Sequence, residues 1–481
     1  MRTANVIASR INAHGRNRID FAPACRPIMR LILVLLATFF GASAFAQTAP
    51  SQPPLVTAFV AVNVVPMDSK RVLSRQTVLV ENGKITAIGT SLPLPKNAQV
   101  IDGHGSAFLS PGLADMHTHS DTRADLLVYL ANGVTTVLNM GGASSDFMDH
   151  ARLASNSGKI PGPHVYASFR VDGSAQYGQF IVTTADEARW IVRLAKTNGY
   201  DFIKVYNNLS PECFQALVDE GRAQHIAIVG HGVTQVGLER QLAAGQVLVA
   251  HAEEFLYTTF AHPNDNNDSV PNPDQIPAAI AFIKRYRAFV TADLNTYSTI
   301  ARQWGKPDVV EGFLQMPETR YLSPDQRIEW RAEDYVRRKG DLSAKLNFLK
   351  RFTKDMSDAG VALVAGTDAP SIPGLVPGFS LHDDLAALEQ AGLDRYHALA
   401  AATRTPGELI HRSIPAAEPF GTVTLGNRAD LILSEKNPLE DLSTLRKPLG
   451  VMANGKWYAR NDLHALLDQV AAKYDSAFLH K

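Results

Sequence analysis

Short apolar runs alternate with longer amphipathic stretches from residue 112 to about residue 402. A short apolar run is typical of a buried strand, and the amphipathic stretch after it is typical of a helix packed on a sheet. Repeated strand–helix units build a parallel sheet. Eight strands are predicted, at residues 112–117, 135–139, 164–168, 202–205, 226–230, 247–250, 288–293 and 362–365. Eight is the number that closes a (β/α)8 TIM barrel, so we expect an α/β fold of that type.

Helical periodicity fills the segments between these strands, for example at residues 185–198 and 211–224. The charged segment 300–359 is longer than one strand-to-strand crossover needs. It is therefore expected to hold two or three helices.

The two ends of the chain differ from this central pattern. Short β-rich pieces at 60–65, 76–80, 84–88 and 98–101 alternate with turn residues, which predicts antiparallel strands joined by hairpins. Hairpin character returns at 421–433 and 449–455, and a last helix is predicted to begin at a cap on Asn461 or Asp462. We expect one small β-sandwich domain with a C-terminal helix, built from residues 47–110 and 412–481, beside a barrel of residues 111–411.

Residues 1–46 read as a secretory signal peptide. An apolar run at 31–40 follows Arg30 and precedes an Ala-x-Ala cleavage signal that ends at Ala46. The run is shorter than the roughly 20 residues that a membrane-spanning helix needs. Cleavage after Ala46 predicts an exported protein, periplasmic or secreted, with no membrane contact once the signal is removed. Met29 is an alternative start, with residues 1–28 upstream of it.

Charge and cysteine content argue against a nucleic-acid partner and against an internal disulfide. The 481 residues include 47 Lys plus Arg and 47 Asp plus Glu, so overall charge gives no reason to expect a nucleic-acid partner. Cys25 leaves with the signal, so that Cys213 remains alone and no internal disulfide is expected. Cys213 stands at a predicted helix start and is interpreted as structural. A homo-oligomer is left open.

The first barrel strand ends in the sequence Met-His-Thr-His, which places His117 and His119 two residues apart. On a strand, residues with this spacing project from the same face, so both imidazoles reach one point. Such a pair is half of a metal site. The alternative is one hydrogen-bonded core histidine and one solvated histidine.

Four more polar residues stand where later strands end, and function in a barrel gathers at this end of the strands. They are Lys204, His231, His251 and Asp368. Each has its own structural explanation: a lysine at the barrel rim, a lone core histidine, or an aspartate that caps a helix. Six such groups at the ends of strands one, four, five, six and eight favour a shared site.

With this set of residues, the chain resembles the amidohydrolase superfamily, most closely its imidazolonepropionase-like enzymes and metallo-dipeptidases of the prolidase type. The short motifs Ile101-Asp-Gly103, Pro111-Gly-Leu113, Gly421-Thr-Val423 and Ala429-Asp-Leu-Ile432 also resemble that family. The resemblance covers essentially the whole mature chain.

The resemblance implies two divalent metal ions, usually Zn²⁺, bridged by a hydroxide and by a lysine that CO₂ has converted to a carbamate. A lysine ammonium cannot bind a cation, whereas a carbamate is anionic and reaches both ions. Asp368 would also act as the general base that passes a proton to the leaving nitrogen. The implied ligands are His117, His119 and Asp368 for one ion, His231 and His251 for the other, and Lys204 as the bridge.

Residues for substrate contact are less sharply indicated. Tyr206 shares a strand face with Lys204 and could bind a carbonyl or an oxyanion, or could simply fill space at the rim. Segment 255–277, which includes Tyr257, could be a lid or a plain surface loop. Arg170 and Asn139, which lie at the ends of neighbouring strands, could orient substrate. His382 begins a predicted helix and is interpreted as structural.

The expected function is hydrolysis of a carbon–nitrogen bond in a dipeptide or an N-acyl amino acid by a metal-bridging hydroxide. A cyclic-amide hydrolase of the imidazolonepropionase type is an alternative. A one-metal heterocycle deaminase is disfavoured by Lys204 and by the sequence His231-Gly-Val-Thr234, which lacks a His-x-x-Glu motif. A metal-binding protein without catalysis is disfavoured by Asp368.

Overall fold

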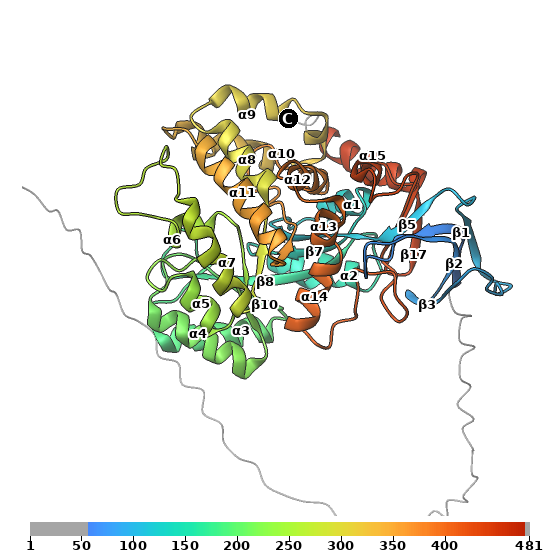
Figure 1. The fold of residues 1–481 in the computed structure, drawn as a ribbon, viewed down its shortest axis with the longest axis horizontal. Coiled ribbons are helices and arrows are strands. Elements are labelled where there is room, and N and C mark those ends of the chain that lie inside the picture. Colours follow the sequence, from blue (N-terminus) through green and yellow to red (C-terminus); the bar gives the residue numbers. More distant parts are fainter. Residues whose placement is uncertain (1–55, 477–481) are drawn as a thin grey trace, which may run out of the picture. The chain divides into compact units, whose positions relative to one another are not determined.

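Eight parallel strands form a nearly closed barrel in the computed structural model, which describes residues 56–476 (Figure 1). Neighbouring strands follow chain order around the barrel, as strand–helix units require. The eight predicted strands are thus confirmed, with ends that differ by at most a few residues. They are β6 (Leu113–Thr118), β7 (Val134–Asn139), β8 (His164–Asp172), β10 (Phe202–Val205), β11 (Ala227–Gly230), β12 (Gln246–Val249), β13 (Phe289–Thr291) and β14 (Ala362–Val364), with the short β9 (Phe180–Ile181) beside β8.

The barrel closes between β14 and β6 by single hydrogen bonds and one isolated bridge. The Met116 amide donates to the Ala365 carbonyl oxygen at 2.9 Å, and the Asp368 amide donates to the His117 carbonyl oxygen at 2.7 Å. Gly366 fits here because a Cβ atom at this position would lie 2.8 Å from the His117 Cβ. The end of the eighth strand therefore lies directly against the histidine pair.

Helices cover the barrel, and their starts follow sequence signals. Thr184 forms a capping box with Glu187 before α3, and Ser210 caps α4 one residue before Pro211. The helices are α1 (Arg123–Ala131), α2 (Leu153–Asn156), α3 (Ala185–Thr197), α4 (Pro211–Gln224), α5 (Leu238–Ala244), α6 (Glu254–Thr258), α7 (Ile276–Arg285), α8 (Leu294–Gln303), α9 (Pro307–Leu314), α10 (Pro324–Ala332), α11 (Ser343–Asp358), α12 (Phe379–Gln390), α13 (Arg395–Ala401), α14 (Arg404–Ser413) and α15 (Arg460–Ser476).

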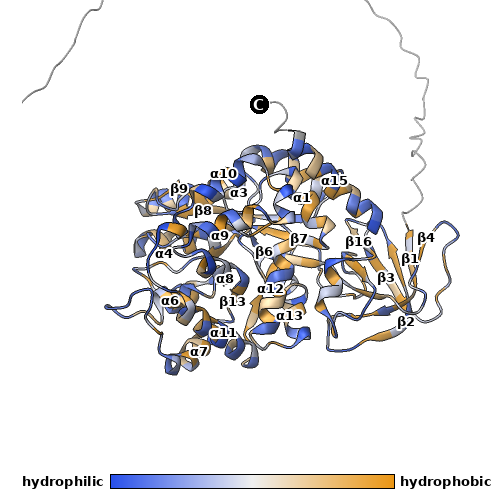
Figure 2. Cartoon of the chain, turned by 90° about the horizontal axis from the view of Figure 1, so that it is seen from above, coloured by the Kyte–Doolittle hydropathy of each residue, from blue (hydrophilic) through white to orange (hydrophobic). Residues whose placement is uncertain are grey.

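The charged segment 300–359 holds the end of α8 together with α9, α10 and α11, in agreement with its predicted helical character. Hydrophobic colour follows strands such as β6 and β7, while hydrophilic colour is common on the helices around them (Figure 2). Within residues 56–476, no helix combines the length and the apolarity that a membrane span requires.

A second, eight-stranded sheet takes strands from both ends of the chain, as predicted. Its order is β17-β16-β15-β5-β1-β2-β3, with β4 paired to β1. The Ile85 amide donates a hydrogen bond to the Asn427 carbonyl oxygen, and the Gly426 amide donates one to the Ile85 carbonyl oxygen. These bonds join β3 to the segment before β15, so the sheet curls around a core that includes Phe59, Leu431 and Met452. The strands are β1 (Val56–Val64), β2 (Leu73–Glu81), β3 (Lys84–Gly89), β4 (Gln99–Asp102), β5 (Phe108–Pro111), β15 (Leu431–Ser434), β16 (Gly450–Ala453) and β17 (Lys456–Ala459).

The prediction of antiparallel strands is wrong for β4, which pairs parallel to β1. The strand β5, which was not among the predicted pieces, also pairs parallel to β1. Only β1, β2 and β3 form the expected antiparallel hairpins. The reason is the connection after β3, which crosses to the other edge of β1 and does not turn back as a hairpin. The last helix begins at Arg460, just before the predicted cap.

Two further predictions concern the ends of the chain and its cysteine. The predicted signal peptide, residues 1–46, lies outside the described residues. Cys213 is a free, buried thiol in α4, in agreement with a structural role.

A buried ion pair joins the second sheet to the barrel. Arg428 and Asp430 are each about 5% exposed or less and lie 2.6 Å apart. Arg428 also donates a hydrogen bond of 2.7 Å to the Thr136 hydroxyl in β7, and its guanidinium lies over the Phe420 ring. Loss of either charge would leave the other buried without its partner.

We predict that Asp430→Asn lowers the free energy of unfolding by about 3–5 kcal/mol, because it leaves a buried guanidinium without a counter-charge. Urea denaturation measures the change. As a control, Glu418→Gln removes one side of the exposed Lys84–Glu418 pair and should cost at most about 1 kcal/mol. A loss for Asp430→Asn no larger than that of the control would contradict the structural role of the pair.

Candidate metal centre

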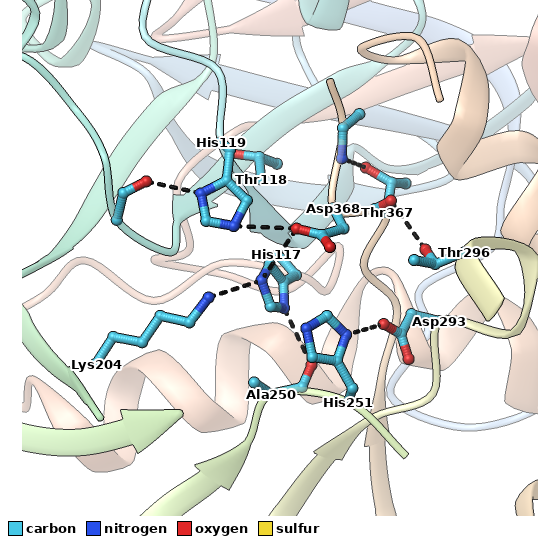
Figure 3. Close-up of polar contacts among 12 residues, drawn as sticks. His117, Thr118, His119, Lys204, Ala250, His251, Asp293, Thr296, Thr367 and Asp368 are labelled. Carbon is cyan, nitrogen blue, oxygen red and sulfur yellow. Dashed lines mark hydrogen bonds and ion pairs between the residues drawn. The ribbon is translucent and has the colours of Figure 1, made fainter. Parts of the chain in front are cut away.

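The six strand-end groups singled out in the sequence lie together at one end of the barrel. Figure 3 shows three histidines and Asp368 directed toward one another, with the Lys204 side chain reaching His117. Ligand atoms of His117, His251 and Asp368 all lie within 4.8 Å of one another, close enough to hold one metal ion. Their positions are His117 in β6, His119 one residue after β6, Lys204 in β10, His231 directly after β11, His251 two residues after β12, and Asp368 four residues after β14.

The histidine pair of the first strand is oriented by backbone carbonyl groups. The His117 Nδ1 lies 3.0 Å from the Ala250 carbonyl oxygen, and the His119 Nδ1 lies 2.7 Å from the Gly141 carbonyl oxygen. A carbonyl oxygen only accepts hydrogen bonds, so each Nδ1 carries the proton. Each Nε2 of a neutral ring then has a free lone pair.

The other two histidines are oriented by carboxylates. The His231 Nδ1 lies 2.5 Å from a Glu254 oxygen, and the His251 Nδ1 bonds Asp293 (Figure 3 shows the latter). A carboxylate or carbonyl on one ring nitrogen, with the other nitrogen directed into a shared space, is the usual arrangement of metal-binding histidines. All four rings in this centre have it.

Within residues 56–476, two of the Nε2 atoms face either an acceptor or no hydrogen-bond partner. The His119 Nε2 lies 3.0 Å from an Asp368 oxygen, so a lone pair faces a carboxylate when the ring is neutral. The His231 Nε2 is buried and has no hydrogen-bond partner among the described residues. A cation between the His119 Nε2 and the Asp368 oxygen would satisfy both of these acceptors. A cation beside the His231 Nε2 would give that buried nitrogen a partner.

Burial keeps most of these rings neutral. It lowers the pKa of His117 well below its usual value, lowers that of His119, and lowers that of His231 to about 4. His251 is the exception: burial alone would lower its pKa, but the charge of Asp293 and the hydrogen bond to it raise the pKa to about 9.

Lys204 is fully buried, and its Nζ lies 3.1 Å from the His117 Nε2. Burial lowers the pKa of Lys204 to about 7, although the charge of Asp368 opposes that shift. The neutral amine is therefore a major form of this side chain near pH 7. The rim position suggested as an alternative for this lysine does not agree with its complete burial.

Asp368 adopts a left-handed conformation, with φ of 58°, and no helix begins beside it, since α12 starts at Phe379. It is therefore not a helix cap. Burial would raise its pKa, but the contact with His119 and the charges of His251 and Lys204 hold that pKa below the usual range. Asp115 fixes the preceding residue, because its carboxylate accepts a 2.7 Å hydrogen bond from the Thr367 hydroxyl.

A cavity of about 510 Å³ opens directly above the centre. The Tyr206 ring stacks on the His231 ring at 3.8 Å between ring centres, and the Tyr177 ring stacks on the Tyr206 ring at 5.1 Å. The residues that line the cavity are Gln176, Tyr177, Tyr206, Asn207, Asn208, His231, Thr234, His251, Glu253, Glu254, Tyr257, Thr296, Ile300, Tyr335, Asp368 and Ile372.

The predicted substrate contacts separate into two groups. Tyr206 and the half-exposed Tyr257 line this cavity. Arg170 and Asn139 do not. Arg170 pairs in register with Lys204, while Asn139 accepts a hydrogen bond from the Gly141 amide and so shapes the loop that orients His119.

Two other predictions from the sequence concern His382 and segment 255–277. His382 is buried in α12, and its Nε2 lies 2.9 Å from the Asn132 carbonyl oxygen, which agrees with a structural role. Segment 255–277 begins with α6 and is tied to residues 339–345 by hydrogen bonds such as Asn267 to the Lys339 carbonyl oxygen.

Several solved structures have a similar fold. Bottromycin amidohydrolase aligns at a TM-score of 0.67 and 22% identity, over 87% of this chain and 90% of that one. A Xaa-Pro dipeptidase with bound methionine aligns at 0.61 and 19%, over 84% and 100%. Ochratoxinase from A. niger aligns at 0.60 and 20%, over 85% and 96%. This chain has the amidohydrolase fold. No protein-family model and no curated protein matches its sequence.

Sequence reasoning missed the two carboxylates that orient histidines in this amidohydrolase-fold chain. Asp293 ends the predicted strand 288–293, and Glu254 follows His251 by three residues. Their shared signal is an acidic residue close to the end of a barrel strand. The sequence does not say which histidine such a residue faces, because the partners come from different strands.

We predict that Asp293→Asn lowers the pKa of His251 from about 9 in the metal-free protein, because burial is then opposed only by the smaller effects of the Asp368 and Glu253 charges. Nitrogen-15 NMR titration of the imidazole measures the change. Because the folded pKa lies above the unfolded one, His251 stabilises the metal-free fold below pH 6.5, and this contribution is lost as the pH rises through about 9. The exposed control Asp383→Asn should leave the titration unchanged, and an unchanged titration in Asp293→Asn would contradict the assigned contact.

Proposed function

We propose that this chain is a metal-dependent amidohydrolase that cleaves a carbon–nitrogen bond in a dipeptide or a similar small amide. The observation that carries the proposal is the common orientation of the four histidines, whose Nδ1 atoms are all bonded outward. The fold shared with an amidohydrolase and a Xaa-Pro dipeptidase supports it. Membership of the amidohydrolase superfamily is part of this proposal.

The donor set fits divalent metal ions, and Zn²⁺ above all. Neutral imidazole nitrogen and carboxylate oxygen are its ordinary protein ligands. Divalent ions bound at these positions would lower the pKa of a water molecule and polarise a carbonyl oxygen. In our proposal, one ion is held by His117, His119 and Asp368, the other by His231 and His251, with Lys204 shared between them.

Lys204 is suited to that shared role because burial leaves much of it neutral. The neutral amine is the form whose nitrogen bonds to the carbon of CO₂, with loss of one proton, to give an anionic carbamate. This change replaces a buried amine beside the His117 Nε2, 3.1 Å away, with an oxygen donor. Lys204 is fully buried, so bulk water is excluded and the carbamate is protected.

Asp368 is the proposed general base. It is ionised at neutral pH because its pKa is held low, and it faces both the cavity and the His119 Nε2. In this role it accepts a proton from the attacking water and returns it to the leaving nitrogen. Tyr206, whose pKa burial raises, keeps its hydroxyl proton and is available to donate a hydrogen bond to the developing oxyanion.

We predict about two divalent ions per chain in the purified wild-type protein, and loss of most of this metal in Lys204→Ala. Elemental analysis by mass spectrometry measures the content, and circular dichroism checks that the variant folds. Lys284→Ala, at an exposed lysine, is the matched control and should retain full metal. Full occupancy in Lys204→Ala would refute the carbamate bridge.

We predict that the zinc-loaded protein cleaves members of a library of dipeptides and N-acyl amino acids. Asp368→Asn should lower kcat by about 10²- to 10⁴-fold, because the proton transfer is lost. The exposed carboxylate variant Asp219→Asn should retain wild-type kcat. Absence of carbon–nitrogen bond cleavage across the library, with both metal positions filled, would refute the proposed function.

A further inference from the structure

Glu253 is a carboxylate in the wall of the cavity that the proposed chemistry leaves unused. It stands two residues after His251 and is partly buried. Its side chain does not cap the short helix α6 that follows it. Among residues 56–476, no hydrogen-bond or ion-pair partner of its carboxylate is found, whereas Glu254 is bonded to His231 and Asp368 faces His119.

The cavity wall contains no lysine or arginine that could neutralise Glu253. The wall does contain the His251 ring, which can carry a positive charge, but that ring is already bonded to Asp293. Lys204 lies beneath the cavity against His117. The wall therefore supplies no lysine or arginine to pair with the Glu253 carboxyl group, and a cationic group of a molecule that enters the cavity can take that place.

Two tyrosines, Tyr257 and Tyr335, line the same cavity as Glu253. Tyr257 comes from α6, and Tyr335 comes from a short 3-10 turn, 334–337, between α10 and α11. A carboxylate that shares a cavity with tyrosine rings suits an ammonium group, because the ring faces attract cations.

We propose that Glu253, with Tyr257 and Tyr335, binds a protonated amino group of the substrate and makes the enzyme prefer free amines to N-acylated or deaminated amides. This proposal rests on the proposed function and narrows it from amides in general to amides that carry an ammonium group. The ammonium can be the α-amino group of a dipeptide or a side-chain amine, and both present the same charge to Glu253.

Two pairs of probes separate these sources in the zinc-loaded enzyme. Leucyl-proline and 4-methylpentanoyl-proline differ only in the α-amino group. N-acetyl-lysyl-proline and N-acetyl-norleucyl-proline differ by the side-chain amine. Each compound is measured as a substrate and, where it is not turned over, as a competitive inhibitor of the best substrate in the library. Wild type should prefer the amine of one pair by about 10- to 100-fold, mainly through KM or the inhibition constant.

Glu253→Gln should abolish that preference, because it weakens the binding of the amine compound alone. The binding of the uncharged partner compound and the metal content should stay unchanged. Tyr335→Leu should reduce the preference in the same direction. Glu239→Gln, at an exposed surface carboxylate, is the matched control and should keep the wild-type preference.

Three results would overturn the inference while leaving the proposed hydrolase intact. They are equal use of charged and uncharged partners by wild type, an equal loss for both partners in Glu253→Gln, and a loss of metal in that variant. A best library substrate without an amine would overturn it as well. A failure of the proposed function is distinct, because no amide in the library would then be cleaved.

Discussion

The hydrogen bonds on the Nδ1 atoms of four histidines are the interaction on which this centre depends. Two backbone carbonyl groups and two carboxylates hold these nitrogens, so the four Nε2 atoms are directed inward. Without these contacts, each ring could turn or change its tautomer, and the inward lone pairs would be lost. The cavity, the buried lysine and the low pKa of Asp368 matter chemically because the rings already have this orientation.

The barrel supplies the orienting groups from strands other than those that carry the histidines. His251 is held by Asp293, which follows the next strand, and His117 is held by the carbonyl of Ala250 across the barrel. Asp115 ties the first strand to the eighth through Thr367, beside Asp368. The site is thus a product of barrel closure, and a shift of one strand would change several ligands together.

Much of the fold could be predicted because strand–helix alternation and apolar runs are local properties. The eight strands were located from such runs, and the spacing of His117 and His119 placed both rings on one face. The parallel pairing of β4 and β5 could not be predicted, because it depends on which edge of β1 a connecting segment reaches. The roles of Glu254 and Asp293 were missed for the same reason, since their histidine partners lie 23 and 42 residues away.

The sequence by itself determined which chemical groups stand at the ends of the barrel strands, because strand periodicity and chain order settle that. It did not determine their protonation or their free partners. Those were decided by tertiary structure, which buries Lys204 so that its pKa falls to about 7 and brings Glu253 and the distant Tyr335 into the wall of one cavity. Burial and electrostatic contact are properties of the closed barrel and its loops, and neither exists until residues far apart in the chain have come together.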